Sequence, residues 1–95
     1  MPRTAEYVAV YDVASDRERS RVAKVLEGFG IRVQQSAFEC QLTRGAREQL
    51  KKRLEELALE TGFVYLYRRE ALSRRIGIGK CPENPFDDSH YAYVI

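Results

Sequence analysis

Asp12 is the residue of this sequence whose type and position point most directly to chemistry. It stands near the end of an apolar segment, residues 7–13, and strand alternation puts it on the same face as Val8 and Val10. A carboxylate in that position must lie near solvent, be paired, or bind a cation. Asp also begins turns frequently, so a simple turn residue is the competing interpretation, and spacing alone favours it modestly.

A single carboxylate makes a poor magnesium site, because Mg²⁺ keeps several waters and is commonly held by one or two carboxylates together with phosphate oxygens. No DxD motif accompanies Asp12. A two-fold dimer axis near Asp12 would bring a second carboxylate from the other subunit. The hypothesis is therefore a metal-dependent phosphodiesterase with its metal between two subunits. Asp16 has a structural explanation in the first turn of a helix, where the helix dipole favours a carboxylate.

The positive charges are mostly arginines, twelve against four lysines, and arginine is the better fork for phosphate. They gather in the first predicted helix, on the strand after it and near the C-terminal segment. The members are Arg17, Arg19, Arg21, Lys24, Arg32, Arg68, Arg69, Arg74, Arg75 and Lys80. The net charge of +2 does not by itself indicate nucleic acid. Charge runs are usually solvated faces, so a phosphate-binding surface and an ordinary solvated surface both fit.

Other reactive residue types offer no site of their own. His90 has no nucleophile to pair with, and Cys40 and Cys81 belong to no CxxC or CxxH pair, which favours two reduced thiols over a zinc site. The six tyrosines can stack on bases, but packing on a face of the sheet or in a dimer interface explains them better.

The elements that must position these residues follow the order of a split β-α-β unit. Residues 7–13 are rich in β-branched and aromatic side chains, which is typical of a central strand. Ser15 and Glu18 have the spacing of a capping box, with Ser15 as N-cap and Glu18 reaching back, and Gly30 suits a helix C-cap, which predicts a first helix over residues 16–29. The other predicted elements are strands over 31–34, 36–42 and 63–67 and a helix over 46–59. This order predicts a single α+β domain over residues 1–95, a ferredoxin-like βαββαβ sandwich with both helices on one face.

The last residues, 91–95, form an apolar strand with no obvious place in a four-stranded sheet. Such a strand must pair with something. We expect the segment 70–95 to cross to a partner subunit, so that an extra C-terminal strand is exchanged in a homodimer; packing back on its own sheet is the alternative. No apolar run approaches the length of a membrane span and no signal peptide is recognisable, so we expect a cytoplasmic protein without membrane contact.

One stretch of the chain, from about residue 7 to residue 39, resembles the small CRISPR-associated adaptation protein family. The pattern of that family is an apolar strand ending in Tyr-Asp-Val/Ile, an arginine-bearing helix, and then Gly-x-Arg-Val-Gln-x-Ser-Val-Phe-Glu. Ala37 replaces the usual Val and Gln35 the frequent Tyr. The matching residues are Tyr11-Asp12-Val13, Asp16, Arg19, Arg21, Gly30, Arg32-Val33-Gln34 and Ser36-Ala37-Phe38-Glu39.

The resemblance implies a ferredoxin-like homodimer in which Asp12 of both subunits holds Mg²⁺ or another divalent cation. It implies metal-dependent cleavage of RNA or DNA phosphodiester bonds during CRISPR adaptation, the acquisition of spacers. The larger CRISPR adaptation integrase and nucleic acid, bound through phosphate contacts, are the implied partners. The residues implied to surround the substrate beside Asp12 are Tyr11, Arg19, Arg21, Arg32, Ser36 and Phe38, with the arginines on phosphate and Phe38 shaping the site.

Two other functions compete with the endonuclease. In the first, Asp12 is catalytically idle and the protein is a DNA-binding scaffold subunit of the adaptation integrase complex. In the second, the chain is a regulatory or RNA-binding module on a fold that hosts many functions. The second leaves the Tyr-Asp-Val and Arg-Val-Gln-x-Ser-x-Phe-Glu segments unexplained, whereas the first explains them equally well.

Overall fold

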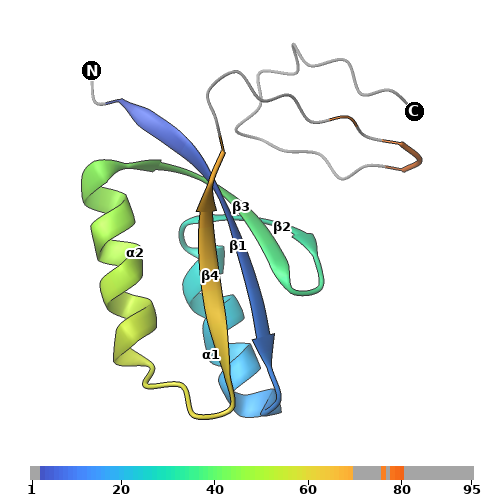
Figure 1. The fold of residues 1–95 in the computed structure, drawn as a ribbon, viewed down its shortest axis with the longest axis vertical. Helices are drawn as coiled ribbons and strands as arrows, with labels where there is room; N and C mark the ends of the chain where they lie inside the picture. The colour runs from blue at the N-terminus through green and yellow to red at the C-terminus, as the bar shows by residue number, and fades with distance from the viewer. Residues whose placement is uncertain (1–2, 70–75, 77, 81–95) are drawn as a thin grey trace.

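The computed structural model describes residues 3–69, 76 and 78–80, and its elements follow the predicted order (Figure 1). They are β1 (Thr4–Val13), α1 (Asp16–Glu27), β2 (Gly30–Gln34), β3 (Ala37–Thr43), α2 (Arg44–Glu56) and β4 (Gly62–Arg68). The ferredoxin-like α+β fold is thereby confirmed. The predicted strand over residues 91–95 lies outside the described residues, as does most of the segment 70–95. Within the described part of the chain, no helix is long and apolar enough to cross a membrane.

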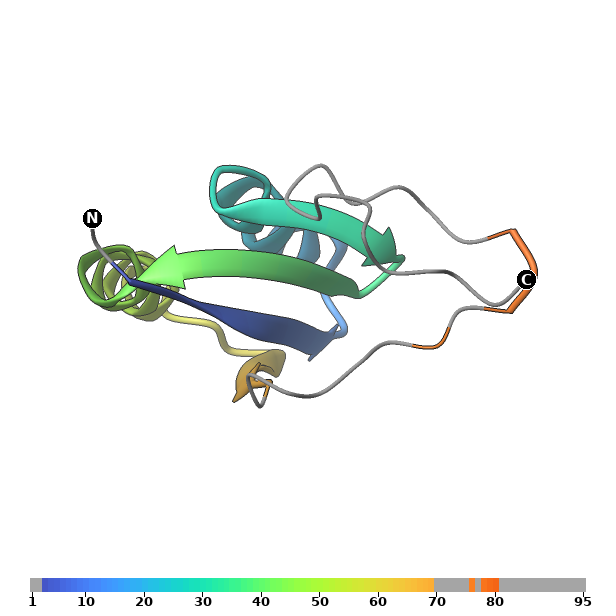
Figure 2. The same ribbon diagram turned by 90° about the horizontal axis from the view of Figure 1, so that it is seen from above.

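The sheet is antiparallel, with the strand order β2-β3-β1-β4 (Figure 2). β1 pairs with β3 over Thr4 to Val10 and with β4 over Tyr7 to Val13, so the first and third strands are central, and the prediction of a central strand over residues 7–13 is confirmed. A bulge interrupts the pairing of β2 with β3 between Arg32 and Gln34.

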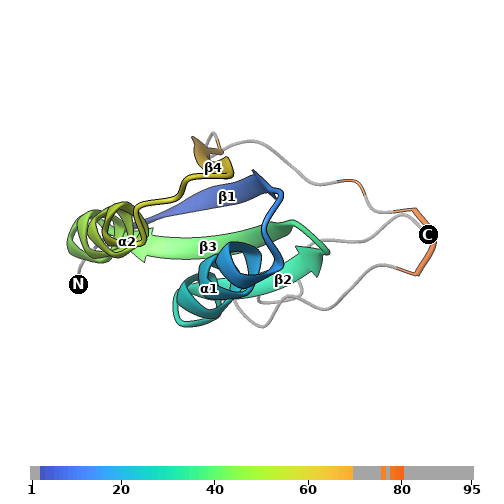
Figure 3. The same ribbon diagram turned by 90° about the horizontal axis from the view of Figure 1, so that it is seen from below.

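Alternate residues of the central strands build the core on the helix side of the sheet. Both helices lie on this side: α1 packs against β1 and β2, α2 packs against β3, and the helices contact each other (Figure 3). Phe38, Leu26, Leu50 and Val22 are the largest fully buried side chains. The buried residues of the core are Tyr7, Ala9, Tyr11, Val13, Val22, Ala23, Leu26, Phe38, Cys40, Leu42 and Leu50.

Both helices begin at a hydroxyl cap. Ser15 Oγ accepts the N–H of Glu18 at 3.2 Å, and Thr43 Oγ1 accepts the N–H of Ala46 at 3.1 Å. α1 ends at Glu27 with Gly28 as its C-cap, so the predicted end at residue 29 with Gly30 as the cap was wrong by two residues. α2 starts two residues earlier and ends three residues earlier than predicted.

The other side of the sheet carries an exposed apolar face. Val8, Val10 and Asp12 of β1 stand opposite Tyr67, Tyr65 and Phe63 of β4, in that order. The three aromatic rings form a continuous row: Phe63 and Tyr65 lie 4.7 Å apart between ring centroids, and Tyr65 and Tyr67 lie 5.9 Å apart. All three rings are about half exposed. We call these five apolar residues, Val8, Val10, Phe63, Tyr65 and Tyr67, the open face; Asp12 stands at one end of it.

Candidate active site

Asp12 lies at the exposed end of β1, next to the open face. Its neighbours Tyr11 and Val13 point to the other side of the sheet and are buried there, which fixes the direction of the Asp12 side chain. Gly62 of β4 packs directly against this backbone. A Cβ at position 62 would lie 2.6 Å from the Cα of Val13 and closer still to the carbonyl oxygen of Asp12. The carboxylate is therefore solvent-accessible on a backbone with little room to move.

The turn after Asp12 is held by Arg19. Its Nη1 donates to the carbonyl oxygens of Val13 and Ala14, at 2.9 and 3.4 Å, and its Nη2 pairs with the carboxylate of Asp16. The sequence predicted that Arg19 would bind phosphate, and the structure shows it bonded within the protein. Asp16 has a second structural role as its ion-pair partner.

Four of the predicted substrate residues meet on the helix side of the sheet. Tyr11, Arg19, Arg32 and Ser36 line a hollow of about 420 Å³, together with Ser20, Ala23 and Gln35. The hydroxyl of Tyr11 and Nη1 of Arg32 both donate to the carbonyl oxygen of Gln35, at 3.0 and 2.7 Å. The hollow holds two guanidinium groups and two serines, but both arginines already have carboxylate partners within the protein: Arg19 pairs with Asp16, and Nη2 of Arg32 lies 4.0 Å from a carboxylate oxygen of Glu27.

Phe38 and Arg21 do not line this hollow. Phe38 has no exposed surface; its ring lies under Arg32, 5.1 Å from the guanidinium carbon, and 6.4 Å from the ring of Tyr11. It can therefore shape the hollow only by supporting those two side chains. Asp12 points to the opposite side of the sheet, so one subunit has its Asp12 carboxylate and this arginine-lined hollow on two different faces.

The exposed side of α1 carries a stripe of three cations, Arg17, Arg21 and Lys24. Their spacing of four and three residues places them along one side of the helix. All three side chains are exposed, and none forms an ion pair with a described carboxylate. This stripe can contact phosphates without first breaking a bond inside the protein.

Within the described part of the chain, no three His, Cys, Asp or Glu side chains are close enough together to hold a metal ion. Asp12 alone could supply only one ligand of a magnesium ion, and the other ligands would have to be water, phosphate oxygens or a second carboxylate. Mg²⁺ accepts such a mixed shell, because it keeps several waters and needs one or two carboxylates. Cys40 is no candidate ligand, since burial raises the pKa of its thiol to about 11.

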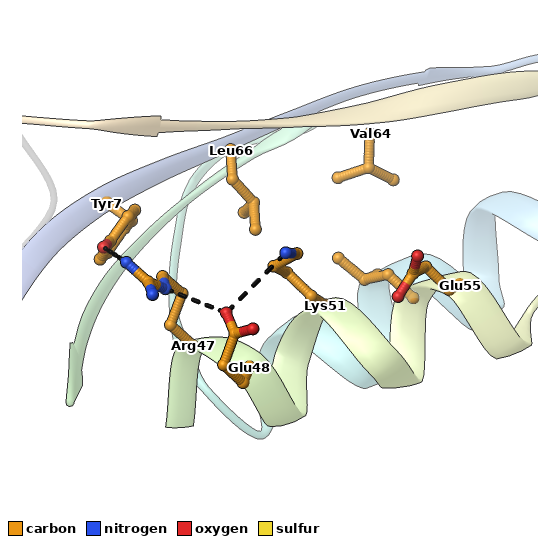
Figure 4. Close-up of a pocket in the computed structure, with 8 residues that line it drawn as sticks. Tyr7, Arg47, Glu48, Lys51, Glu55, Val64 and Leu66 are labelled. Carbon is orange, nitrogen blue, oxygen red and sulfur yellow. Dashed lines mark hydrogen bonds and ion pairs between the residues drawn. The ribbon is translucent and has the colours of Figure 1, made fainter. Parts of the chain in front are cut away.

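A second hollow, of about 560 Å³, lies between α2 and β4, and no pattern in the sequence indicated it (Figure 4). Leu54, Val64 and Leu66 supply its apolar surface. Three of its charged side chains are joined: Arg47 and Lys51 share the carboxylate of Glu48, and Arg47 also donates to the hydroxyl of Tyr7 at 3.2 Å. Glu55, which also lines the hollow, forms no ion pair with a described residue. The hydrogen bond to Tyr7 is the main cause of a raised pKa at Arg47. Apart from Glu55, this hollow offers packing space rather than unpaired charged groups.

Sequence reasoning missed two residues near Asp12. Glu18 was expected to complete a capping box by reaching back to Ser15, and this was wrong: its carboxylate instead accepts hydrogen bonds from Glu60 and Thr61 in the loop before β4. Thr61, which follows the predicted helix over residues 46–59, had no predicted role in the site. The contact joins residues more than forty positions apart, and no local pattern could have indicated it.

These features define a class: a small ferredoxin-like protein with an exposed carboxylate at the end of its first strand and an arginine-rich helix beside it. The family model described as "CRISPR associated protein Cas2" matches residues 6–75. The chain belongs to this family, as the resemblance of residues 7–39 indicated.

Individual relatives agree with the family assignment. The chain is 39% identical over 87 residues to the "CRISPR-associated endoribonuclease Cas2 1" of Chloroflexus aurantiacus, covering 85% of this chain and 94% of that protein. It is 44% identical over 75 residues to a Cas2 endoribonuclease of Thermus thermophilus, covering 76% and 80%. The Cas2 endoribonuclease of Mycobacterium tuberculosis is 39% identical over 61 residues, which is 64% of this chain but only 54% of the relative. The chain thus spans about half the length of that relative.

Solved structures show the same fold. A hypothetical protein from Thermus thermophilus superposes with a TM-score of 0.71 at 32% identity, covering 84% of this chain and 99% of that one. Cas2 of Streptococcus pyogenes superposes with a TM-score of 0.59 at 29% identity, covering 65% and 82%.

Proposed function

We propose that this chain is a divalent-metal-dependent endonuclease of CRISPR adaptation that cleaves RNA or DNA phosphodiester bonds as a homodimer. The names of its relatives as Cas2 endoribonucleases support the reaction class. The observation that carries the proposal is the position of Asp12, an exposed carboxylate at the end of an exposed apolar face.

The open face supports the homodimer. Three half-exposed aromatic rings in a row, backed by Val8 and Val10, form a contiguous apolar surface of the kind that marks an interface. A second copy seated on this face around a two-fold axis near Asp12 would bring the two carboxylates together. In this proposal the segment 70–95 crosses to the partner and adds its terminal strand there.

The two Asp12 carboxylates would hold a magnesium ion between the subunits. Bound there, the metal would act as a Lewis acid that stabilises the charge developing on the phosphate. The protein's own residues bind and orient the nucleic acid. Arg17, Arg21 and Lys24 of α1 would contact successive phosphates. A phosphate in the hollow around Arg19 and Arg32 would have to compete with Asp16 and Glu27 for these two arginines.

Asp12→Asn tests the catalytic part of the proposal. The variant keeps the size of the side chain, so we expect magnesium-dependent cleavage to be lost while nucleic acid is bound as by the wild type. Two facing carboxylates without metal repel each other, so the variant dimer should be at least as stable as the metal-free wild type. The assay compares labelled single-stranded RNA and duplex DNA, with magnesium and with EDTA, beside a binding measurement.

Glu56→Gln is the matched control, because it removes one exposed carboxylate from α2, outside the candidate site. Full cleavage by Asp12→Asn would remove Asp12 from the mechanism. A wild type that binds nucleic acid but never cleaves it would favour the other function, a scaffold that holds DNA for the larger adaptation integrase.

A further inference from the structure

The turn that follows Asp12 is held by a distant part of the chain, the loop between α2 and β4, which passes beside the start of α1 (Figure 1). The carbonyl oxygen of Thr61 accepts the N–H of Ala14 at 3.0 Å, and Thr61 Oγ1 accepts the N–H of Ser15 at 3.0 Å. One residue therefore satisfies both backbone donors that come directly after β1.

Glu18 holds Thr61 in place. Its carboxylate accepts the N–H groups of Glu60 and Thr61, both at 2.9 Å, and also the hydroxyl of Thr61. Hydrogen bonds to an ionised acceptor are about twice as strong as neutral ones. The Thr61 hydroxyl is the main cause of a lowered pKa at Glu18, so these contacts favour the ionised carboxylate.

The next residue carries this contact to the candidate metal ligand. Gly62 packs on the backbone of Asp12 and Val13, and Phe63 pairs with Asp12 across the sheet. A shift of Thr61 must therefore move the backbone that carries the Asp12 carboxylate.

We propose that Glu18 and Thr61 are positioning residues for Asp12. They contact neither metal nor substrate; they fix the turn from which the carboxylate projects. The inference rests on the proposed function, since it assumes that Asp12 binds a metal. Misplacing a reacting group by about 1 Å can cost about a hundredfold in rate, while substrate bound elsewhere is unaffected.

Thr61→Val is the sharpest test, because it removes the hydroxyl and keeps the backbone groups and the branched shape. We expect kcat to fall about 10- to 100-fold with KM within about twofold, and the affinity for Mn²⁺ to weaken. Amide hydrogen exchange at Ser15 should become faster. Thr61→Ser keeps the hydroxyl and should restore all three. Glu18→Gln should act like Thr61→Val, and Glu56→Gln should match the wild type.

The outcomes separate this inference from the proposed function. Wild-type kcat in Thr61→Val, or a loss that Thr61→Ser does not reverse, would overturn the positioning role. If the wild type does not cleave, the nuclease proposal fails and Mn²⁺ affinity decides. Weaker Mn²⁺ binding in Thr61→Val that Thr61→Ser restores supports positioning, and equal binding in Thr61→Val and the wild type overturns it. A wild type that neither cleaves nor binds Mn²⁺ overturns both. If Thr61→Val does not fold, the same readings are taken from Glu18→Gln.

Discussion

At Asp12, an exposed side chain projects from a closely packed backbone. The carboxylate is open to solvent, whereas the backbone below it touches Gly62 and is bonded to Arg19. Substituting Arg19 would therefore disturb the turn as well as any phosphate contact, so a loss of activity in such a variant does not by itself identify a substrate-binding residue.

Gly62→Ala tests how close this packing is. The added methyl group meets backbone atoms of Asp12 and Val13 that cannot rotate away, so we expect a loss of about 1–3 kcal/mol in the free energy of unfolding. Gly45→Ala is the control, because a Cβ there meets nothing within 4 Å and should stabilise α2 by about 0.5–1 kcal/mol. Urea unfolding of both variants measures the difference. Equal stabilities would contradict the packing argument.

The hydrogen bonds of Glu18 make part of the stability depend on pH. Its pKa is lowered chiefly by the Thr61 hydroxyl, then by the N–H of Glu60, with Arg21 adding a smaller effect. Because the folded pKa lies below the ordinary value of 4.5, this contribution is complete above that value and is lost as pH falls through the folded pKa. The unfolding free energies of wild type and Glu18→Gln should therefore differ most at neutral pH and converge in acid. A constant difference down to about pH 2 would show that Glu18 does not titrate as described.

Among the elements, α1 carries cations that the sequence predicted to bind nucleic acid and that are not engaged in ion pairs with the described part of the protein. Arg21 is exposed and forms no ion pair with a described carboxylate. Arg21→Glu should weaken binding equally for different sequences of the same length, and should reduce the salt slope of log K by about one unit. Lys52→Glu reverses another exposed positive charge, on α2, and is the control. Fluorescence anisotropy over a salt series measures both, and an unchanged slope in Arg21→Glu would exclude this contact.

Most elements could be predicted from the sequence, since period-two and helical spacing are local properties. The face of Asp12, shared with Val8 and Val10, followed from the same alternation. The helix ends could not be predicted as well. Gly45 argued against an earlier start of α2, although the helix does begin at the Thr43 cap. Gly30 resembled a helix cap, but glycine is needed there because the backbone of residue 30 lies too close to Cys40 to leave room for a Cβ.

The site was harder to predict than the fold because tertiary contacts compete with local ones. Phe38 belongs to the matching motif, but the motif does not reveal that its ring is wholly buried beneath Arg32. Glu18 fits a capping box, but the loop at residues 60–61 offers three donors where the backbone of Ser15 offers one. The roles of the predicted site residues in catalysis stay predictions.

For the whole molecule, we expect the open face to be the surface through which two subunits form the dimer. Tyr65 lies in the middle of the aromatic row and is 53% exposed in one subunit. Tyr65→Glu places a charge there without disturbing the core, so we expect a folded monomer in sedimentation velocity, because a buried unpaired charge is costly. Gln49→Glu adds the same charge on the exposed side of α2 and should leave the dimer intact. A Tyr65→Glu protein that remains dimeric would place the interface elsewhere.

The hollow between α2 and β4 has a consequence for motion. β4 is an edge strand whose helix side is only partly covered and whose other side is the open face, so it should be the first strand of an isolated subunit to open. Poorly covered elements open locally at a lower free energy than the core does. If a second copy packs over β4, this strand can open only after the subunits dissociate. The thermal stability of the protein then depends on its concentration, because dissociation follows mass action. We expect the melting temperature to rise with protein concentration, and β4 amides to exchange faster on dilution while those of β1 and β3 change less.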